Sequence, residues 1–430
     1  MIEESGQINS RGQIHLPKSW PLERMQQEAR EYYLTWSEKY VQERNLPKGE
    51  GRQLFVDYLA GQRESPAFTW GDRRALTVSE AHGYGMLAVC GMAAIDQEYK
   101  TESARADFDA LARLFLSFPS KGDKRLMTWQ LFGDGIDPAT GKGNSNTIQP
   151  GQRQFSATDG DMDIAYSFLL ADSLWPGQGL EGSSYREMAL EVISGLRESC
   201  TNTAGTVLYI GDWAGSGSSH STVTRSSDFM PAHLSAFAAA DTAHSAHWET
   251  LREAQISLVF ATNAGPAENS GLVPDFFKSY NKATGFEPAR TQVLESPHDG
   301  DYNWNACRVP WRLGATWLAE ADPRLEKILH EGTVMIRKLS GGDPSRIPPG
   351  QYLSSGPVSQ PIPGRNYSDY SFTAPWALAA ACTAGAELWT EALLDELGSW
   401  RTEGLSSYFG DSIRLLVYLT LAGAYGHLDD

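Results

Sequence analysis

The sequence is poor in cysteine and contains no long hydrophobic run. Its four cysteines, Cys90, Cys200, Cys307 and Cys382, are far apart and lack the close Cys or His spacing of zinc and redox motifs. Three of them lie in apolar helical patterns, so we expect them to be buried as small hydrophobic side chains. No stretch reaches the about 18 apolar residues that span a membrane. These absences predict no metal, no cofactor and no contact with a membrane.

Basic residues are also scarce. The chain has 36 Lys and Arg against 53 Asp and Glu, a net charge of −17, and the basic side chains are scattered. Because binding to phosphate groups requires clustered basic residues, we exclude nucleic acid as a partner. An acidic surface attracts cationic polymers, but acidity is also a common means of remaining soluble. Residues 1–5, MIEES, lack the basic and apolar parts of an export signal, so we expect any such signal to lie outside this sequence.

Helical periodicity dominates the sequence, whereas strand signals are few and short. Ser79, Thr101, Asp322 and Pro231 stand where helix starts favour such residues, which supports the assignment. The twelve expected helices span 21–42, 79–98, 101–117, 160–175, 183–200, 231–243, 247–262, 306–321, 323–339, 373–387, 388–402 and 405–424.

Two kinds of helix alternate along the chain. Segment 83–94 is small and apolar nearly all round, as expected of an inner helix with neighbours on every side. Segment 101–117 has a single apolar stripe, as expected of an outer helix. Six inner and six outer helices would close an all-α double barrel, an (α/α)6 barrel, with a cleft at one end. Since no repeat of fixed period and no interdomain linker is found, we predict a single domain over residues 1–430.

Long irregular segments and aromatic residues are both abundant. The chain contains 13 Trp and 17 Tyr, more than a core requires, and stacking of flat rings on sugar faces is one use for them. Loops of such length in a compact chain usually form functional rims. The irregular segments are 44–78, 118–158, 201–230, 264–304 and 340–372.

Three segments combine groups that can carry chemistry. In 77–86, Glu80 stands at the mouth of an otherwise apolar helix, either as a partner of the helix dipole or as a carboxyl exposed to a cleft. In 155–167, Asp159 and two further Asp alternate as at the start of a calcium loop, but the Gly and Glu that such a loop needs are missing. Asp159 would then cap a helix or point into the cleft.

The third segment, 302–312, has two Trp and two Arg around a helix start. Arg308 and Arg312 are four residues apart and share a helix face, so they are candidates for buried partners of carboxylates. A salt-bridged helix entry without any role in a site is the alternative.

Together these segments resemble glycoside hydrolase family 8. SEAHGYGM at 79–86 is similar to the SEGxGYGM element of that family, and SATDGDMDIA at 156–165 matches its highly specific SATDGDxDIA signature. The resemblance covers nearly the whole chain. Further matching segments are LMTW at 126–129, GDW at 211–213, RSSDFMPAHL at 225–234 and NACRVPWR at 305–312.

The resemblance implies a secreted enzyme with an (α/α)6-barrel fold. It would hydrolyse internal β-1,4 bonds of a polysaccharide with inversion of the anomeric configuration. By match to the motifs, Glu80 would be the general acid and Asp159 would bind the sugar at the point of cleavage. The stacking candidates are Trp129, Trp213 and either Tyr302 or Trp304, and the other expected substrate contacts are Tyr84, Arg225, Asp228, Asn305 and Arg308.

The general base departs from the pattern of the cellulase and xylanase members, which have an Asp where this chain has Asn305. An amide cannot take a proton from water at a useful pKa, so Asn305 is not the base. A subgroup of chitosanases and lichenases also has Asn there and takes its base from a Glu on an inserted loop, to which Glu295 corresponds. Asp299 and Asp301 are nearby rivals. A chain without any base, able only to bind glycans, is the alternative.

The substrate is the least determined property. The subgroup acts on chitosan, on β-1,3-1,4-glucan and on carboxymethyl cellulose. We place chitosan slightly ahead of the β-glucans, because both the Glu295 loop and the acidic charge balance favour it. A lichenase or endoglucanase without chitosanase activity is the second interpretation. Asp212 and Asp228 are the acidic residues that could favour an amino sugar.

Overall fold

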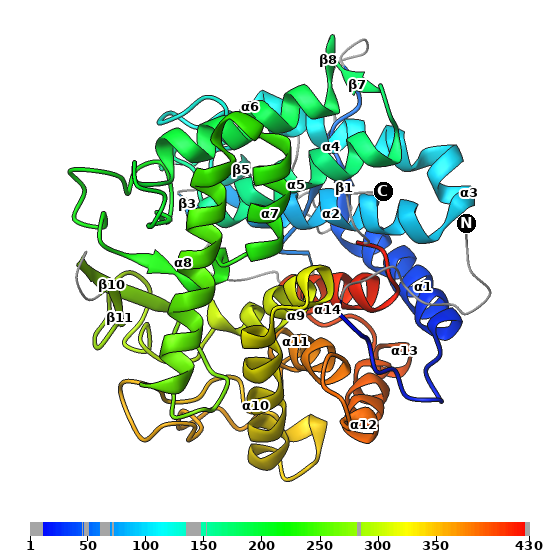
Figure 1. Ribbon diagram of the computed structural model, residues 1–430. Helices are drawn as coiled ribbons and strands as arrows, with labels where there is room; N and C mark the ends of the chain where they lie inside the picture. Colours follow the sequence, from blue (N-terminus) through cyan, green and yellow to red (C-terminus); the bar gives the residue numbers. More distant parts are fainter. Residues whose placement is uncertain are drawn as a thin grey trace.

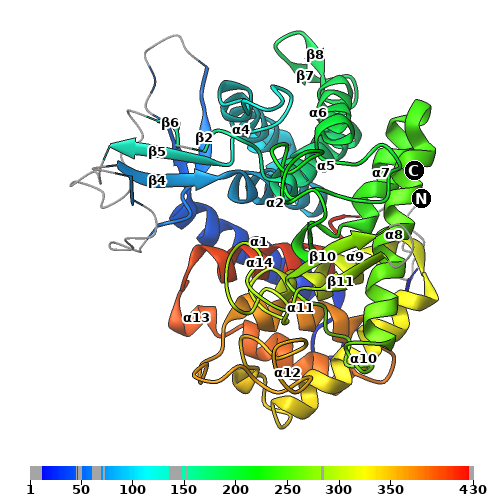
Figure 2. The ribbon, with the colours of Figure 1, turned by 90° about the vertical axis from the view of Figure 1, so that its left-hand side faces the viewer.

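The computed structural model describes residues 12–44, 46, 51–60, 69–70, 73–134, 148–151, 153–281 and 285–425. These parts are mainly helical, with several small separate sheets (Figure 1, Figure 2). Within these ranges no helix is both long and apolar enough to cross a membrane. The four cysteines are free thiols and all are buried, which confirms the burial expected of three of them and adds the fourth.

Six helices form a closed inner ring (Figure 1). Each packs against the next in chain order, and the last, α14, packs against the first, α2. An inner helix contacts neighbours on every side, and accordingly every residue of α11 after Tyr370 is buried. The ring consists of α2 (Ser79–Ile95), α5 (Thr158–Leu174), α7 (Pro231–Ala240), α9 (Val309–Glu320), α11 (Tyr370–Ala381) and α14 (Tyr408–Leu421).

Six further helices surround the ring, and each packs one apolar face on it. In α10, Leu325, Ile328, Leu329 and Ile336 are buried at helical spacing, which is the amphipathic pattern of an outer helix. The predicted all-α double barrel is therefore confirmed. The outer helices are α1 (Leu22–Tyr40), α4 (Arg105–Ser117), α6 (Tyr185–Ser199), α8 (Ser245–Ala264), α10 (Pro323–Leu339) and α12 (Glu387–Leu397).

Several helix ends differ from the prediction. Ser79 is the first residue of α2 rather than its cap, because the strand β4 (Arg73–Val78) leads directly into the helix. Thr101 lies inside a π-helical turn, Lys100–Ala104, that precedes α4. The segment expected as one helix over 388–402 is divided into α12 and the short α13 (Trp400–Glu403). In contrast, Asp322 caps α10 as predicted, since its carboxylate accepts a hydrogen bond from the Arg324 N–H at 2.9 Å.

Small antiparallel sheets occur mostly in the segments expected to be irregular, with β1, β7 and β8 outside them (Figure 2). The prediction missed them because their strands have only two to six residues, too few for a periodic pattern. One sheet has the order β3 (Thr69–Trp70), β4, β5 (Gln130–Asp134) and β6 (Gln149–Pro150); another has β11 (Gly285–Pro288), β10 (Phe276–Asn281) and β9 (Thr224–Arg225). Two-stranded pairs are β1 (Val41–Glu43) with β2 (Leu54–Val56), and β7 (Gly179–Leu180) with β8 (Ser183–Ser184).

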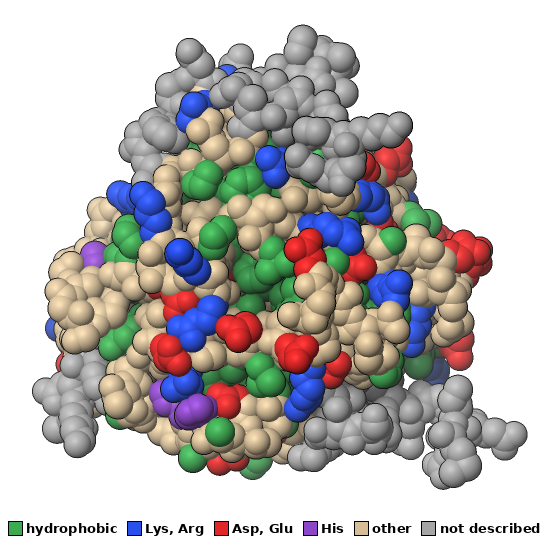
Figure 3. Space-filling view, turned by 90° about the horizontal axis from the view of Figure 1, so that it is seen from above, with side chains coloured by type: hydrophobic (Ala, Val, Ile, Leu, Met, Phe, Trp, Pro, Cys, Tyr) green, Lys and Arg blue, Asp and Glu red, His purple; other side chains and the backbone are tan. Residues whose placement is uncertain are grey.

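The face on the side of α4 and α6 has charges of both signs (Figure 3). Lys and Arg side chains are interspersed with Asp and Glu around a hollow where hydrophobic side chains are exposed. The net negative charge of the chain is therefore not concentrated on this face. Mixed charge of this kind is typical of a solvated surface.

Candidate active site

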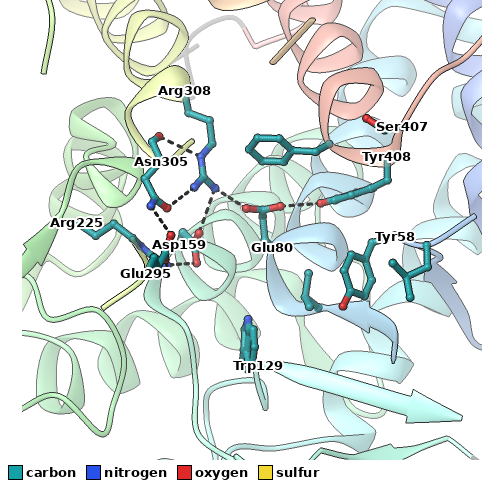
Figure 4. Close-up of a pocket in the computed structure, with 13 residues that line it drawn as sticks. Tyr58, Glu80, Trp129, Asp159, Arg225, Glu295, Asn305, Arg308, Ser407 and Tyr408 are labelled. Atoms are coloured by element: carbon teal, nitrogen blue, oxygen red, sulfur yellow. Dashed lines mark hydrogen bonds and ion pairs between the residues drawn. The ribbon is translucent and has the colours of Figure 1, made fainter. Parts of the chain in front are cut away.

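A cleft opens where the amino-terminal ends of inner helices α2, α5 and α14 meet (Figure 4). It has a volume of about 330 Å³. Helix starts supply several of its groups, which therefore stand on rigid elements at the end of the barrel, and loops supply the remaining groups. The lining residues are Tyr58, Leu59, Val78, Glu80, Trp129, Asp159, Arg225, Glu295, Asn305, Arg308, Ser407, Tyr408 and Phe409.

Glu80 is the second residue of α2 and lies between Tyr408 and Arg308 (Figure 4). The Tyr408 hydroxyl donates a hydrogen bond to Oε1 at 2.9 Å, and Arg308 Nη1 donates to Oε2. Burial raises the pKa of Glu80, and neighbouring Asp159 adds to the rise, although Arg308 and Tyr408 oppose it. A carboxyl with a raised pKa keeps its proton to higher pH, as a proton donor requires.

The register of a small sheet brings Trp129 beside the start of α2. Val78, the last residue of β4, pairs with Gln130, the first of β5. The next pair outward is therefore Ser79 and Trp129, and the Ser79 N–H donates to the Trp129 carbonyl at 2.8 Å. The Trp129 side chain is 38% exposed, so its ring is available on the wall of the cleft. Figure 4 shows it across the open space from Glu80 and Arg308.

Asp159 lies in the first turn of α5 between two arginines. Arg225 Nη2 is 2.9 Å from Oδ1, and Arg308 Nη1 is 3.3 Å from Oδ2. The next residue, Gly160, allows α5 to approach α2 this closely, because a Cβ there would lie 2.4 Å from the backbone carbon of Ser79. This contact places Glu80 and Asp159 on the same side of the cleft and lets Arg308 bind both.

Glu295 lies on the loop that follows β11 and lines the same cleft. Its side chain is 41% exposed, and its Oε2 accepts a hydrogen bond from Asn305 Nδ2 at 2.8 Å. Arg225 Nη1 is 3.9 Å from Oε1. Asn305 Oδ1 in turn accepts from Arg308 Nη2 at 2.9 Å, so both ends of its amide are engaged.

The two rivals of Glu295 do not line the cleft. Asp299 is fully buried, and its carboxylate accepts backbone N–H groups from each residue of 293–296. Asp301 is also fully buried, and its carboxylate binds the backbone N–H groups of 353–355. Because these oxygens are engaged away from the cleft, neither carboxylate is placed to bind a water molecule there.

Some predicted substrate contacts are corrected by burial. Tyr302 is 1% exposed, and its ring packs against Phe372 and Trp376, so it has no face to offer a sugar. Tyr84 is equally buried beneath the cleft, where its hydroxyl lies 3.4 Å from Arg308 Nη1. Both residues were predicted from sequence matches, which do not show whether a ring faces the core.

The other aromatic candidates lie outside the lining. Trp304 packs its ring against Phe372, with 5.0 Å between ring centroids. Trp213 is half-buried and meets His220 edge-on at 5.1 Å. Of the predicted stacking residues, Trp129 alone is among the described lining residues of the cleft.

Asp228 supports the site from behind rather than lining it. It is fully buried, and its Oδ1 accepts hydrogen bonds from Arg225 Nε at 2.9 Å and Ser227 Oγ at 2.7 Å. Burial raises the pKa of Asp228 to about 6. Asp212 likewise holds loops together, since its carboxylate accepts the backbone N–H groups of Asp123 and Ser156, both at 3.0 Å.

The three alternating Asp of α5 point to different partners. Asp161 accepts the Met127 N–H at 2.8 Å, whereas Asp163 binds Arg312 through both oxygens at 2.9 and 2.6 Å. Burial would raise the pKa of Asp163, but Arg312 and His233 outweigh it and lower the pKa. The predicted pairing of the two arginines with carboxylates is thus confirmed. Arg308 binds carboxylates of the cleft, and Arg312 binds a carboxylate in the core below it.

Several lining residues were not found from the sequence, among them the aromatic residues Tyr58, Tyr408 and Phe409. Tyr408 and Phe409 stand at the start of the last inner helix, the same position that Glu80 and Asp159 occupy in theirs, and this equivalence was the available signal. Asp275 was also missed. Its buried carboxylate accepts the N–H groups of Asn305 at 3.0 Å and Ala306 at 2.7 Å, and so fixes the turn that carries Asn305 and Arg308.

One end of the double ring of helices holds a carboxyl of raised pKa, arginine-bound carboxylates and an exposed indole. This is the arrangement of a glycan-cleaving enzyme. The sequence profile of glycosyl hydrolases family 8 matches residues 67–335. The chain belongs to this family and is a glycoside hydrolase.

Individual relatives agree with this assignment. The chain is 32% identical over 347 residues to a beta-glucanase of Niallia circulans, covering 81% of the chain and 76% of the relative. It is 28% identical over 421 residues to an endoglucanase of Bacillus sp. (strain KSM-330), covering 97% and 80%. Among solved structures, the apo beta-1,3-1,4-glucanase from Paenibacillus sp. X4 superposes with a TM-score of 0.79 at 28% identity, over 97% of this chain and 96% of that one.

Proposed function

We propose that the protein is an inverting endo-β-glucanase that cleaves internal β-1,4 bonds of β-1,3-1,4-glucan. The observation that carries the proposal is the placement of Glu80 and Glu295 on separate elements that line one cleft. The relatives named beta-glucanase, endoglucanase and beta-1,3-1,4-glucanase support the choice of substrate.

Glu80 is proposed as the general acid. Its raised pKa favours the protonated form, and Tyr408 and Arg308 fix its two oxygens in the cleft. It would protonate the glycosidic oxygen as the bond to the leaving sugar breaks. Because Arg308 is a permanent cation, it also stabilises the carboxylate that remains after the proton has left.

Glu295 is proposed as the general base. It is more exposed than Glu80, and its carboxyl oxygens are oriented in the cleft by the amide of Asn305 at 2.8 Å and by Arg225 at 3.9 Å. It would remove a proton from a water molecule that attacks the anomeric carbon from the opposite face. Inversion requires room for that water, so we expect the two carboxyl groups to stand about 6.5 to 9.5 Å apart in the substrate complex.

Asp159 is proposed to bind the sugar at the point of cleavage. The arginines at 2.9 and 3.3 Å orient its two oxygens, and a carboxylate accepts hydrogen bonds from sugar hydroxyls that strengthen as the ring distorts. Trp129 is proposed to stack on a neighbouring sugar, because its exposed ring forms the wall across from Glu80.

The charge of the cleft favours a neutral glucan over chitosan. Each carboxylate of the described lining faces an arginine: Glu80 meets Arg308, Asp159 meets both arginines, and Glu295 meets Arg225. The ammonium group of an amino sugar would therefore have to compete with these arginines for the carboxylate oxygens. Chitosan is kept as the second candidate because the net charge of −17 attracts a cationic polymer from solution.

Two variants test the roles of the carboxyl groups. Glu80→Gln and Glu295→Gln are each expected to lower the release of reducing ends from soluble β-glucan by at least about a thousandfold, while the thermal unfolding midpoint stays near that of the wild type. Glu287→Gln, which neutralises an exposed Glu on β11, is the control and should retain full activity. If Glu295→Gln keeps most activity, the base is another group.

The reaction itself is tested with three polymers. Lichenan, carboxymethyl cellulose and chitosan are compared side by side, and lichenan is expected to be cleaved fastest. Proton NMR of the first products should show the α-anomer before mutarotation. Initial release of the β-anomer would refute inversion, and binding without any release of reducing ends would point to a non-catalytic glycan-binding protein.

We further propose that the enzyme acts outside the cell, where its polymeric substrate occurs. Fractionation of cultures would test this location.

A further inference from the structure

The carboxylate of Asp299 binds four consecutive backbone N–H groups. Oδ2 accepts from Val293 at 2.7 Å, Leu294 at 2.8 Å and Glu295 at 3.1 Å, and Oδ1 accepts from Ser296 at 2.8 Å. Successive N–H groups that point to one place form a concave anion-binding turn. Here the anion is supplied by the chain itself, and the turn contains Glu295.

An ionised carboxylate is well suited to fill this turn. It offers about four acceptor sites and no donor, whereas an amide has a single acceptor oxygen and would place its own N–H groups against those of the backbone. Asp299 is fully buried, so an N–H group left without its partner would not gain water in exchange. The conformation of residues 293–296 therefore depends on this side chain.

The turn is also tied to the sheet that carries Arg225. The backbone carbonyl of Asp299 accepts the N–H of Phe276 at 2.7 Å, and Phe276 of β10 pairs with Arg225 of β9. Asp299 thus joins the turn that presents Glu295 to the sheet that presents Arg225. The Glu295 side chain itself has few restraints, namely Asn305 at 2.8 Å and Arg225 at 3.9 Å, so its position in the cleft is largely set by its backbone.

We propose that Asp299 is the positioning residue of the general base: it holds the 293–296 turn in the conformation that directs Glu295 to the attacking water. This inference rests on the proposed function, since it assigns a task to Glu295. Asp299 does not touch the cleft and acts only through the turn.

A double-mutant cycle tests the inference. Asp299→Asn is made in the wild type and in Glu295→Gln, and kcat and KM on lichenan are measured for all four proteins. We expect kcat to fall at least about tenfold in the wild-type background, with KM changed less than about threefold, and no more than about a twofold further fall in the Glu295→Gln background. A residue that acts through Glu295 loses its effect once Glu295 is inactive.

Asp301→Asn is the matched control. Asp301 is also fully buried and also binds consecutive backbone N–H groups, but those of 353–355. It should lower the unfolding midpoint, and any loss of kcat should be the same factor in both backgrounds. If Asp299→Asn does not fold, Asp299→Ser, which keeps an acceptor oxygen, takes its place in the cycle.

The outcomes separate the two proposals. If Asp299→Asn leaves kcat within about twofold of the wild type, or lowers it by the same factor in both backgrounds, the positioning role is refuted while the proposed function stands. If Glu295→Gln alone retains activity, the proposed base is wrong, and the positioning role of Asp299 toward that base is refuted with it.

Discussion

Asn305 and Glu295 are joined by a hydrogen bond of 2.8 Å from the side-chain amide to the carboxylate. The other end of the same amide accepts from Arg308, which binds Glu80. One side chain thus connects the groups proposed as base and acid. An amide suits this position because it donates at one end and accepts at the other.

Asn305→Asp is therefore expected to lower the activity of the enzyme, even though it introduces a carboxylate, which is a group that can act as a base. The new carboxylate would face Glu295 and Asp275, which both accept a hydrogen bond from Asn305 Nδ2. Repulsion among three acids should lower kcat at least about tenfold. Asn303→Asp adds the same charge nearby, opposite Arg365, and should retain activity within about twofold. Assays on lichenan would show the contrast, and equal losses would contradict it.

Tyr408→Phe tests the hydrogen bond to Glu80. Because the Tyr408 hydroxyl donates to the carboxyl and lowers its pKa, loss of this donor should raise the already raised pKa of Glu80 further. A general acid works while protonated, so the alkaline limb of the pH dependence of kcat should move to higher pH, and kcat at the optimum should fall several-fold. Tyr418 lies on the same helix, and its buried hydroxyl has no hydrogen-bond partner among the described residues, so Tyr418→Phe should leave the profile unchanged. An unshifted limb in Tyr408→Phe would argue against Glu80 as the acid.

Trp129→Ala should weaken binding of the polymer. Loss of the exposed ring is expected to cost about 1 kcal/mol of binding free energy, which is roughly a fivefold increase in KM with a smaller change in kcat. Trp213→Ala removes an indole of the same size outside the described lining and should change KM less than about twofold. Steady-state kinetics on lichenan distinguish the two. A fall in kcat at unchanged KM for Trp129→Ala would mean that the ring is needed for the chemical step instead.

His82 makes stability depend on pH. Burial lowers the pKa of His82 to about 4, and its Nε2 donates to the Leu111 carbonyl at 2.9 Å. Above pH about 6.5, His82 is neutral in both the folded and the unfolded chain. As the pH falls below that value, His82 binds a proton in the unfolded chain but not in the folded chain. Between about pH 7.5 and pH 5, His82 should therefore subtract about 2 kcal/mol from the free energy of unfolding. Urea titrations of wild type and His82→Gln would show this loss in the wild type alone; parallel losses would mean that other groups cause it.

The helices and the polar motifs were predictable because their signals are local. Apolar periodicity over a dozen residues identifies both inner and outer helices, and the SATDGDMDIA segment placed Asp159 at the start of α5. The direction in which a ring points is not local. Tyr302 and Trp129 are both aromatic residues in matched motifs, yet one packs against Phe372 in the core and the other lines the cleft. Tertiary packing decides this difference.

The supporting contacts were unpredictable for the same reason. Nothing in the order of residues shows that Asp299 folds back on 293–296, or that Tyr408 reaches Glu80 across 328 positions of the chain. The rivalry among Glu295, Asp299 and Asp301 was open in the sequence because all three are acidic and close together. Burial separates them: two are engaged by backbone N–H groups, and Glu295 remains exposed to the cleft.

The closure of the ring by α14 on α2 has a consequence for how the protein is made. Glu80 leaves the ribosome early, but the hydroxyl that orients it belongs to the last inner helix. A growing chain can form most of its helices while the ring is still open at the position of α14, next to Glu80. Activity should therefore appear late and in one step, when α14 docks. Ribosome-bound chains arrested before residue 408 should not hydrolyse the substrate.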